Sequence, residues 1–223
     1  MVDEYEKNIL FDLDGTLTDP KVGITKSISY ALNILKLPVP DNLDWCIGPP
    51  LQNSFAQLLG ASNPALVQPA LKLYRERFVE KGMYENEVYP GIEDFLEKLT
   101  DIKFKMYVAT SKPEVYAKKI IKHFNLEKYF AGVYGSELSG KDCDKAVIIS
   151  NVLEYEKISN FKAVMIGDRS HDLIGAKANG MDAIGVLWGY GSKEEFAPEN
   201  PYAMVKNLMD LEQVIISWSK RKR

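Results

Sequence analysis

Residues 8–19 read NILFDLDGTLTD, which joins an apolar run to two closely spaced acids. The run at residues 8–11 predicts a short buried strand, and Asp12 and Asp14 follow it directly. A turn explains Asp14 and the glycine after it, but it does not explain Asp12. Two carboxylates this close repel each other, so a purely structural site would not gather them. Because ligands bind at the carboxyl ends of strands in open α/β sheets, the stretch predicts a functional site there.

Outside residues 19–88, short apolar runs alternate with longer amphipathic stretches. Further strands are expected at residues 105–109, 132–134, 163–166 and 183–187, and helices at 91–99, 114–124, 145–154, 171–179 and 208–218. Strands that alternate with helices of this length indicate parallel βαβ units with right-handed crossovers. The sequence therefore predicts an α/β fold with a doubly wound parallel sheet, on which the last helix packs back.

Residues 19–88 break the alternation because they contain no convincing strand pattern. Amphipathic stretches occur there at residues 24–35, 51–59 and 65–79, separated by turns that contain proline. We interpret residues 19–88 as an inserted α-helical cap domain, and residues 1–18 plus 89–223 as the α/β catalytic core. The two connecting segments form a natural hinge, so the cap is expected to move as a body.

The overall composition argues against nucleic acid and a lipid bilayer as partners. The chain has 28 basic and 31 acidic residues and a net charge of −3, so it lacks the basic excess of a nucleic-acid-binding protein. No apolar run is long enough to span a bilayer. Cys46 and Cys143 form neither a metal-type pair nor a disulfide framework. These features predict a cytoplasmic protein. We further expect a monomer or weak dimer whose partner is a small molecule.

A second pair of acids follows the strand expected at residues 163–166. Asp168 lies at the strand end, and Asp172 lies in the first turn of the next helix. Such acids can simply stabilise a helix N-terminus. If Asp12 and Asp14 lie at a neighbouring strand end, however, four carboxylates come together. A ligand such as a phosphate ester would add further negative charge, and like charges repel, so the cluster could bind such a ligand only with the help of cations. Carboxylate oxygen and water are ligands that Mg²⁺ accepts, so Mg²⁺ is the expected cofactor.

Basic and hydroxyl side chains complete the expected phosphate site. Lys145 begins the helix after the third strand, where it can reach the centre of the site, and Lys141 is the competing candidate. Thr110, Ser111 and Lys112 follow the second strand, and a hydroxyl with free N–H groups before a helix forms an anion cradle. The same position suits a helix N-cap, and the two roles are compatible.

Four pieces of this pattern carry a family resemblance. They are Asp12-x-Asp14-Gly15-Thr16, the hydroxyl of Thr110, the lysine Lys145, and Gly167-Asp168-x-x-x-Asp172. With these pieces in this order, the chain closely resembles the haloacid-dehalogenase-like superfamily of hydrolases over nearly its whole length. The resemblance implies a helical cap inserted after the first strand, which agrees with the helical block inferred above.

The resemblance also implies a role for each motif residue. Asp12 would attack phosphorus and form an aspartyl-phosphate, while Asp14 would act first as general acid and then as general base. Thr110 and Ser111 would bind phosphoryl oxygens, and Lys145 would neutralise charge. The implied Mg²⁺ ligands are Asp12, the carbonyl oxygen of Asp14, Asp168 and Asp172. The residues expected to contact the substrate are Gly15, Thr16, Gly48, Pro49, Ser111 and Lys112.

Two branches of the superfamily compete. Residues 23–28, 47–51 and 185–191 look like the 5′-nucleotidase-like branch, whereas the general architecture also looks like phosphoglycolate phosphatases. The latter commonly have Lys-Pro-x-Pro at the motif lysine, but residues 144–147 here read DKAV. We therefore expect a Mg²⁺-dependent phosphatase of small phosphomonoesters that resembles 5′-nucleotidases. A phosphoglycolate phosphatase and a β-phosphoglucomutase-like phosphomutase are the alternatives.

Selectivity must come from the cap and the neighbouring loops, because the phosphoryl site is generic. The candidates are Ile24, residues 47–51 and residues 188–190, which are mostly apolar or aromatic, and the nearby cations are Lys26 and Lys112. An apolar and aromatic pocket entrance suits the face of a base or a sugar. We therefore expect a higher kcat/KM for nucleoside 5′-monophosphates than for phosphoglycolate. A phosphate-accepting signalling module is the alternative from another class, but it would have no helical insert.

Overall fold

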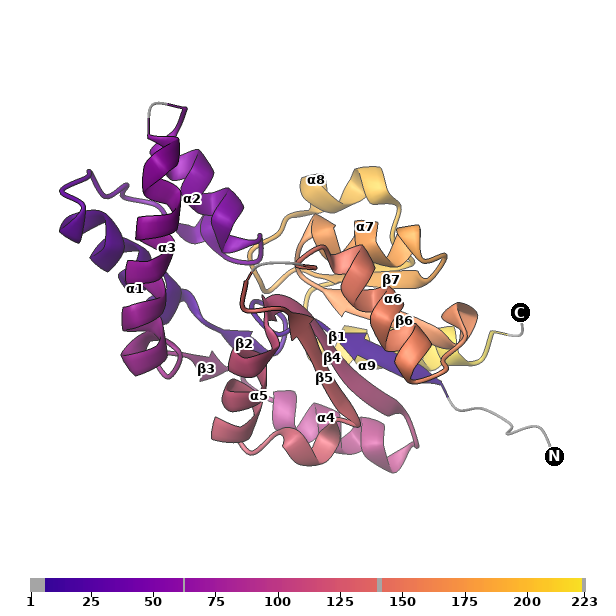
Figure 1. Cartoon of the computed structure of the whole chain (residues 1–223). Coiled ribbons are helices and arrows are strands. Elements are labelled where there is room, and N and C mark those ends of the chain that lie inside the picture. Colours follow the sequence, from indigo (N-terminus) through magenta and orange to yellow (C-terminus); the bar gives the residue numbers. More distant parts are fainter. Residues whose placement is uncertain (1–6, 62, 140–141, 222–223) are drawn as a thin grey trace.

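The computed structural model describes residues 7–61, 63–139 and 142–221. A six-stranded sheet lies at its centre, with the strand order β5-β4-β1-β6-β7-β8 (Figure 1). The strands are β1 Asn8–Phe11, β4 Lys105–Pro113, β5 Gly132–Ser136, β6 Ala163–Gly167, β7 Asp182–Val186 and β8 Ala203–Val205. Every pairing in this sheet is parallel, which confirms the predicted doubly wound α/β fold.

The side chains of a strand point alternately to the two faces of the sheet, so both faces of this sheet carry apolar side chains. Helices cover both faces and bury them. Ile9 and Phe11 belong to one buried cluster, whereas Leu10 between them belongs to a second. The first cluster is completed by helices α4 Ile92–Asp101, α5 Glu114–His123 and α9 Leu208–Ser219. The second is completed by α6 Lys145–Tyr155 and α7 Ser170–Ala178. The remaining short elements are the helix α8 Lys193–Phe196 and 3₁₀ turns at Asp44–Cys46, Pro64–Leu66, Glu127–Tyr129, Asn160–Lys162 and Ala197–Glu199.

The sequence analysis missed one strand, β8, at the edge of the sheet. It spans only Ala203–Val205 and pairs in parallel with β7. So short a run gives no readable periodicity. Helix α9 follows it and contacts it, so the prediction that the last helix packs on the sheet is confirmed. In the described part of the chain, no helix is both long and apolar enough to cross a membrane.

Between β1 and β4 the chain forms a separate helical layer (Figure 1). It consists of α1 Lys21–Ile34, α2 Leu51–Leu59, α3 Val67–Arg77 and a π-helical turn at Phe78–Gly82. Two short strands connect it to the rest, β2 Thr18–Asp19 and β3 Glu87–Val88, and they pair with each other in antiparallel fashion. These helices fill the segment that we interpret as the cap; its separate motion stays a prediction.

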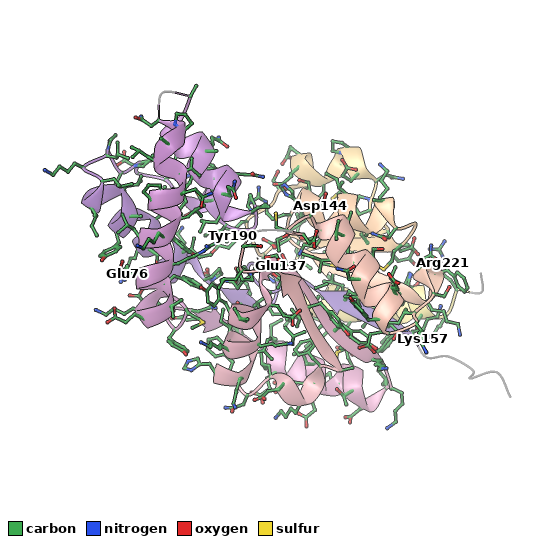
Figure 2. The ribbon with its side chains drawn as sticks, in the orientation of Figure 1. Glu76, Glu137, Asp144, Lys157, Tyr190 and Arg221 are labelled. Carbon is green, nitrogen blue, oxygen red and sulfur yellow. The ribbon has the colours of Figure 1, made fainter. Side chains whose placement is uncertain are left out.

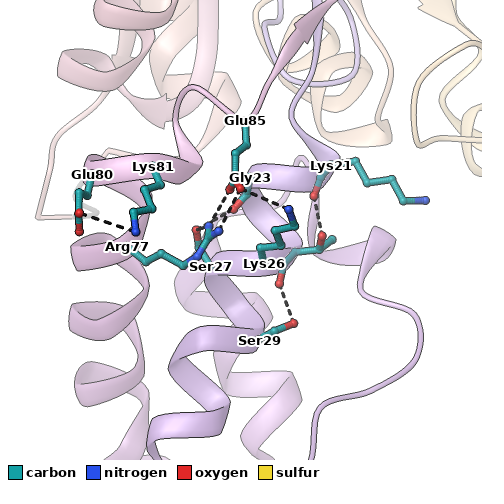
Figure 3. A network of polar contacts seen from close by, with 10 residues as sticks. Lys21, Gly23, Lys26, Ser27, Ser29, Arg77, Glu80, Lys81 and Glu85 are labelled. Carbon is teal, nitrogen blue, oxygen red and sulfur yellow. Dashed lines mark hydrogen bonds and ion pairs between the residues drawn. The ribbon is translucent and has the colours of Figure 1, made fainter.

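The π-helical turn is fixed against the start of α1 (Figure 3). The Gly23 N–H donates to the Glu85 carbonyl oxygen at 3.0 Å, and a Cβ on Gly23 would lie 1.9 Å from the Gly82 carbonyl oxygen. The Arg77 guanidinium donates to Ser27 Oγ at 3.1 Å and pairs with Glu85 at 2.8 Å. Only a glycine fits so close a backbone approach. The network therefore sets the position of the last residues of α3 relative to α1.

Candidate active site

The carboxyl ends of β1, β4 and β6 meet at one edge of the sheet. In the parallel register Phe11 lies opposite Val108 of β4 and Ile166 of β6, so the residues that follow these positions converge. Asp12 directly follows β1, Thr110 lies in β4, and Asp168 directly follows β6. The condition set in the sequence analysis is therefore met, because the strand before Asp12 and the strand before Asp168 are neighbours.

Asp12 is buried at this edge and held from two sides. Its backbone N–H donates to the Ile166 carbonyl oxygen at 2.9 Å, and its Oδ1 accepts from the Leu13 N–H at 2.8 Å. The Lys145 ammonium lies 2.9 Å from the same Oδ1. These contacts fix the direction of the carboxylate, as a nucleophile or a metal ligand requires.

Lys145 lies at the centre of the acid cluster, with its side chain only 3% exposed. Besides Asp12 it contacts Asp172 at 2.7 Å and donates to the Ala109 carbonyl oxygen at 3.0 Å. Its two acidic partners outweigh the effect of burial and raise its pKa, so it stays charged. Asp144 caps the helix by accepting from the Ala146 N–H, which starts α6 at Lys145. The competing Lys141 lies outside the described residues.

Asp14 lies in the turn after β1, where Gly15 has a φ of +85°. Burial raises the pKa of Asp14, and Lys112 at 2.7 Å acts in the opposite direction. Lys112 is itself nearly buried, and its ammonium lies 4.8 Å from the centre of the Phe78 ring in the cap. One cation of the core therefore contacts both an acid of the site and an aromatic residue of the cap.

Asp12, Asp168 and Asp172 can bring one oxygen each within 4.8 Å of one another. All three are buried, and burial together with the charges of Asp12 and Asp172 raises the pKa of Asp168 well above its usual value. A hard divalent cation would offset this repulsion, and carboxylate oxygens are the donors that Mg²⁺ accepts. The residues therefore fit Mg²⁺. The carboxylate of Asp14 stands outside this group and pairs with Lys112.

Asp168 and Asp172 are held by the surrounding backbone. Asp168 Oδ2 accepts from the Tyr190 N–H at 2.8 Å, and Oδ1 accepts from the Thr16 hydroxyl at 3.3 Å. Asp172 Oδ2 accepts from the Arg169 N–H at 3.1 Å, so it also caps α7. The structural and functional interpretations of Asp172 are therefore compatible.

A cavity of about 110 Å³ lies beside Asp12 and Asp14. Thr110, Ser111 and Lys112 line it from the core, and Ile24, Gly48, Pro49 and Leu51 line it from the cap. Gly15 and Thr16 do not line this cavity; Thr16 is buried and donates to Asp168 instead. The pocket thus joins the acids of the sheet edge to the cap loop predicted to face them.

The interpretation of Thr110 and Ser111 as a helix N-cap is wrong. Both residues lie within β4, whose pairing with β5 is irregular between Thr110 and Pro113. The cap position of α5 is Pro113, without a side-chain cap bond. The Thr110 hydroxyl accepts from the Lys112 N–H at 3.3 Å, which stabilises this irregular segment.

Residues 188–190 hold the site together but do not line the cavity. The Trp188 indole N–H donates to the Thr16 carbonyl oxygen at 3.1 Å. The Tyr190 hydroxyl donates to Asp19 in β2, at the junction of core and cap, and Figure 2 labels Tyr190 there. The expectation that this segment lines the pocket is therefore wrong, and its part in substrate selection stays a prediction.

Of the two cations expected near the pocket, Lys112 lines the cavity and Lys26 does not. Lys26 is exposed, pairs with Glu85 at 3.3 Å and does not line the cavity. Arg75 of α3 lines it instead and was missed. A signal was present: Leu71, Tyr74 and Phe78 form the buried face of α3, and position 75 lies on the same face.

Comparison with known proteins agrees with this geometry. The haloacid dehalogenase-like hydrolase family matches residues 9–186. A 5′-nucleotidase of Pseudomonas aeruginosa is 45% identical over 212 residues, which cover 94% of this chain and 96% of that protein. The tyrosine-protein kinase PtkA of Mycobacterium tuberculosis is 34% identical over 214 residues, which cover 95% of this chain and 72% of the kinase. The crystal structure of a "predicted phosphatase" from Clostridium acetobutylicum superposes with a TM-score of 0.91 at 42% identity, covering 96% of this chain and all of that one.

The parallel sheet, the acid cluster at its edge and these relatives define a hydrolase of the phosphatase type. The chain belongs to the haloacid dehalogenase-like hydrolase family.

Proposed function

We propose that the protein is a Mg²⁺-dependent phosphatase that hydrolyses small phosphomonoesters through an aspartyl-phosphate on Asp12. The observation that carries the proposal is the joint placement of Asp12 and Asp14 beside one cavity, each paired with a different lysine. A site with one fixed carboxylate and one separately held acid suits two-step displacement at phosphorus. The separate partners keep the two acids in different roles.

In the first step an oxygen of Asp12 forms a bond to phosphorus, and the bond from phosphorus to the ester oxygen breaks. Asp14 donates its proton to that oxygen, so the leaving group departs as an alcohol. In the second step the oxygen of a water forms a bond to phosphorus, and the bond from phosphorus to the Asp12 oxygen breaks. Asp14 takes one proton of the water. Inorganic phosphate leaves, and Asp12 and Asp14 return to their starting states.

Several groups support these steps without reacting. Thr110 and the Ser111 N–H bind the phosphoryl oxygens, and Lys145 neutralises charge next to Asp12. Asp12, Asp168, Asp172 and the carbonyl oxygen of Asp14 are the proposed Mg²⁺ ligands. When bound, the ion supplies positive charge against the negative charge of the phosphoryl group. Gly48 and Pro49 of the cap contact the leaving group.

Nucleoside 5′-monophosphates are the proposed substrates. The extent and level of similarity to a 5′-nucleotidase support this ranking. So does the aromatic wall of the pocket, where Tyr74, Phe78 and Tyr116 contribute. Arg75 and Lys112 also line the pocket, so cations are available there for the carboxylate of a small acid. Phosphoglycolate therefore remains the alternative substrate, and a phosphomutase the alternative enzyme.

We propose a cytoplasmic enzyme, monomeric or weakly dimeric, whose partner is a small phosphorylated metabolite. We propose residues 19–88 as a cap that closes over the acids and excludes water until Asp12 has reacted. In this view the core of residues 1–18 and 89–223 carries the chemistry and the cap carries the selectivity.

A hydrolysis panel with Mg²⁺ tests the function. It includes nucleoside monophosphates, phosphoglycolate, hexose phosphates and pyrophosphate, with inorganic phosphate as the product measured. Release of phosphate from a nucleoside monophosphate with wild-type enzyme, and its loss in Asp12→Asn, would support the proposal. Transfer of phosphate to a second sugar without release would show a mutase. A stable phosphorylated protein that does not turn over would show a signalling module.

A further inference from the structure

Arg75 stands on the cap side of the cavity that contains the two acids. It lies on α3 between Tyr74 and Phe78, whose rings stack with centroids 5.2 Å apart and an angle of 14° between planes. All three residues line the cavity. A leaving group whose ester oxygen is at Asp14 therefore extends toward a wall made of two aromatic rings and one guanidinium.

Arg75 of α3 and Tyr116 of α5 line the same cavity, one from the cap and the other from the core. Burial raises the pKa of the Tyr116 hydroxyl on α5, and the nearby charge of Arg75 acts in the opposite direction. Burial and, after it, the charge of Asp14 raise the pKa of Tyr74 in the cap, and the charge of Arg75 again acts in the opposite direction. The charge of Arg75 therefore belongs to a cavity that cap and core residues line together.

Arg75 differs from its neighbouring cations because it has no acidic partner. Lys112 pairs with Asp14, and Arg77 pairs with Glu85 and Ser27. Within the described ranges, the Arg75 side chain forms no ion pair and no hydrogen bond with another residue. A guanidinium carries five N–H donors in a fixed fork, and half-buried donors normally find acceptors. These donors are therefore available to a ligand in the cavity.

We propose that Arg75 is a specificity-determining residue that binds an oxygen acceptor on the leaving group of the substrate. The inference rests on the proposed phosphatase function and deepens it. The planar fork matches two acceptors side by side, as on the O6/N7 edge of a 6-oxopurine base. A carboxylate offers the same geometry. The stacked rings beside Arg75 favour the base, because a planar ring can pack against them.

Four substrates distinguish a purine base from a carboxylate as the group that supplies the acceptor oxygen. IMP and AMP have the same size, but position 6 carries an acceptor oxygen in IMP and a donor amino group in AMP. Phosphoglycolate carries a carboxylate and no ring. Phenyl phosphate carries a ring and no acceptor beyond the ester. We would measure kcat/KM for each with the wild type, Arg75→Met and Arg75→Lys.

Lys72→Met is the matched control. It removes one positive charge from the same helix, but Lys72 is exposed and does not line the cavity. Melting temperatures of all variants report whether the fold is intact. Neither substitution breaks an ion pair in the described structure, so both proteins are expected to fold like the wild type.

We expect the wild type to have a higher kcat/KM for IMP than for AMP, and we expect Arg75→Met to remove this difference. Loss of a bidentate contact corresponds to roughly a tenfold or larger fall in kcat/KM for IMP. For phenyl phosphate, kcat/KM of Arg75→Met should stay within about twofold of the wild type. For IMP, kcat/KM of Arg75→Lys should lie between the wild type and Arg75→Met, because lysine keeps the charge but lacks the planar fork. A selective fall for phosphoglycolate instead would support the acceptor contact and identify a carboxylate as its source.

Two outcomes would overturn the inference, and they differ from each other. An equal fall for all four substrates in folded Arg75→Met protein, or no fall for any, would show that Arg75 does not read the leaving group. A wild type that releases phosphate neither from these four substrates nor from the hexose phosphates of the hydrolysis panel would instead reject the proposed phosphatase function itself.

Discussion

The guanidinium of Arg169 donates a hydrogen bond to the Ile47 carbonyl oxygen, with Nη1 and O only 2.5 Å apart. Arg169 follows Asp168 directly, and Ile47 precedes the cap loop that lines the cavity. The Arg169 Nε donates to Glu195 at 3.0 Å, which holds the side chain in place. Gly48 leaves room for it, because a Cβ there would lie 2.7 Å from Arg169 Cγ. The loop that carries one proposed metal ligand thus also holds the cap.

Replacing Arg169 should loosen the cap. In Arg169→Met we expect KM to rise by about tenfold with a smaller change in kcat, because a hydrogen bond from a charged group contributes about 1.5–3 kcal/mol. Steady-state kinetics and limited proteolysis of residues 42–50 would measure this. Lys177→Met is the control, since Lys177 lies on the same helix α7 but pairs with Glu199 at 3.3 Å, away from the cap. A fall in kcat with unchanged KM would show that Arg169 acts through Asp168 instead.

Removal of metal should abolish activity. We expect no turnover in EDTA and recovery with Mg²⁺, because three buried carboxylates converge and Lys145 pairs with two of them, Asp12 and Asp172. Calcium should inhibit, since its looser coordination lets a carboxylate bind through both oxygens, and this would occupy the nucleophilic oxygen of Asp12. Calorimetric titration of Mg²⁺ into the wild type and into Asp168→Asn separates binding from catalysis. Full activity in EDTA would reject the assignment.

The acids of the site could be predicted from the sequence because they stand next to strands. Asp12 and Asp168 each follow a short apolar run, and parallel strands bring such ends to one edge. Arg75 could not be predicted in the same way, because its place depends on how α3 is rotated and docked on the core. Trp188 and Tyr190 show the same limit: an aromatic residue after a strand can face a cavity or bond to a neighbouring loop, and here both bond to a loop or hinge. The sequence pattern determines the sheet, whereas tertiary packing determines the pocket wall.

Close packing of α1 against the π-helical turn should make Gly23 intolerant of a side chain. In Gly23→Ala the new Cβ would meet the Gly82 carbonyl oxygen at 1.9 Å, so the backbone must shift. We expect the free energy of unfolding to fall by about 1–3 kcal/mol, as for other overpacked sites. This corresponds to a melting temperature lower by roughly 2–12 °C for a chain of this size. Ser29→Ala is the control, because the Ser29 hydroxyl bonds only within α1, to the Thr25 carbonyl oxygen. Equal melting temperatures for the two variants would contradict the packing argument.

Asp14 should matter most for substrates whose leaving group needs a proton. Burial raises the pKa of Asp14 while Lys112 holds its carboxyl group at 2.7 Å, so it is fixed and able to carry a proton. We expect Asp14→Asn to lose about 10²–10⁴-fold in kcat on an alkyl phosphate, because its alkoxide is a poor leaving group. The loss on p-nitrophenyl phosphate should be much smaller, since a nitrophenolate leaves without protonation. Asp12→Asn provides the comparison, because loss of the nucleophile should abolish turnover of both substrates alike. The ratio of the two losses therefore distinguishes the two acids. If Asp14→Asn lost the same factor on both substrates, protonation of the leaving group would not be the role of Asp14, and its part in water activation or in holding Lys112 would have to explain the defect.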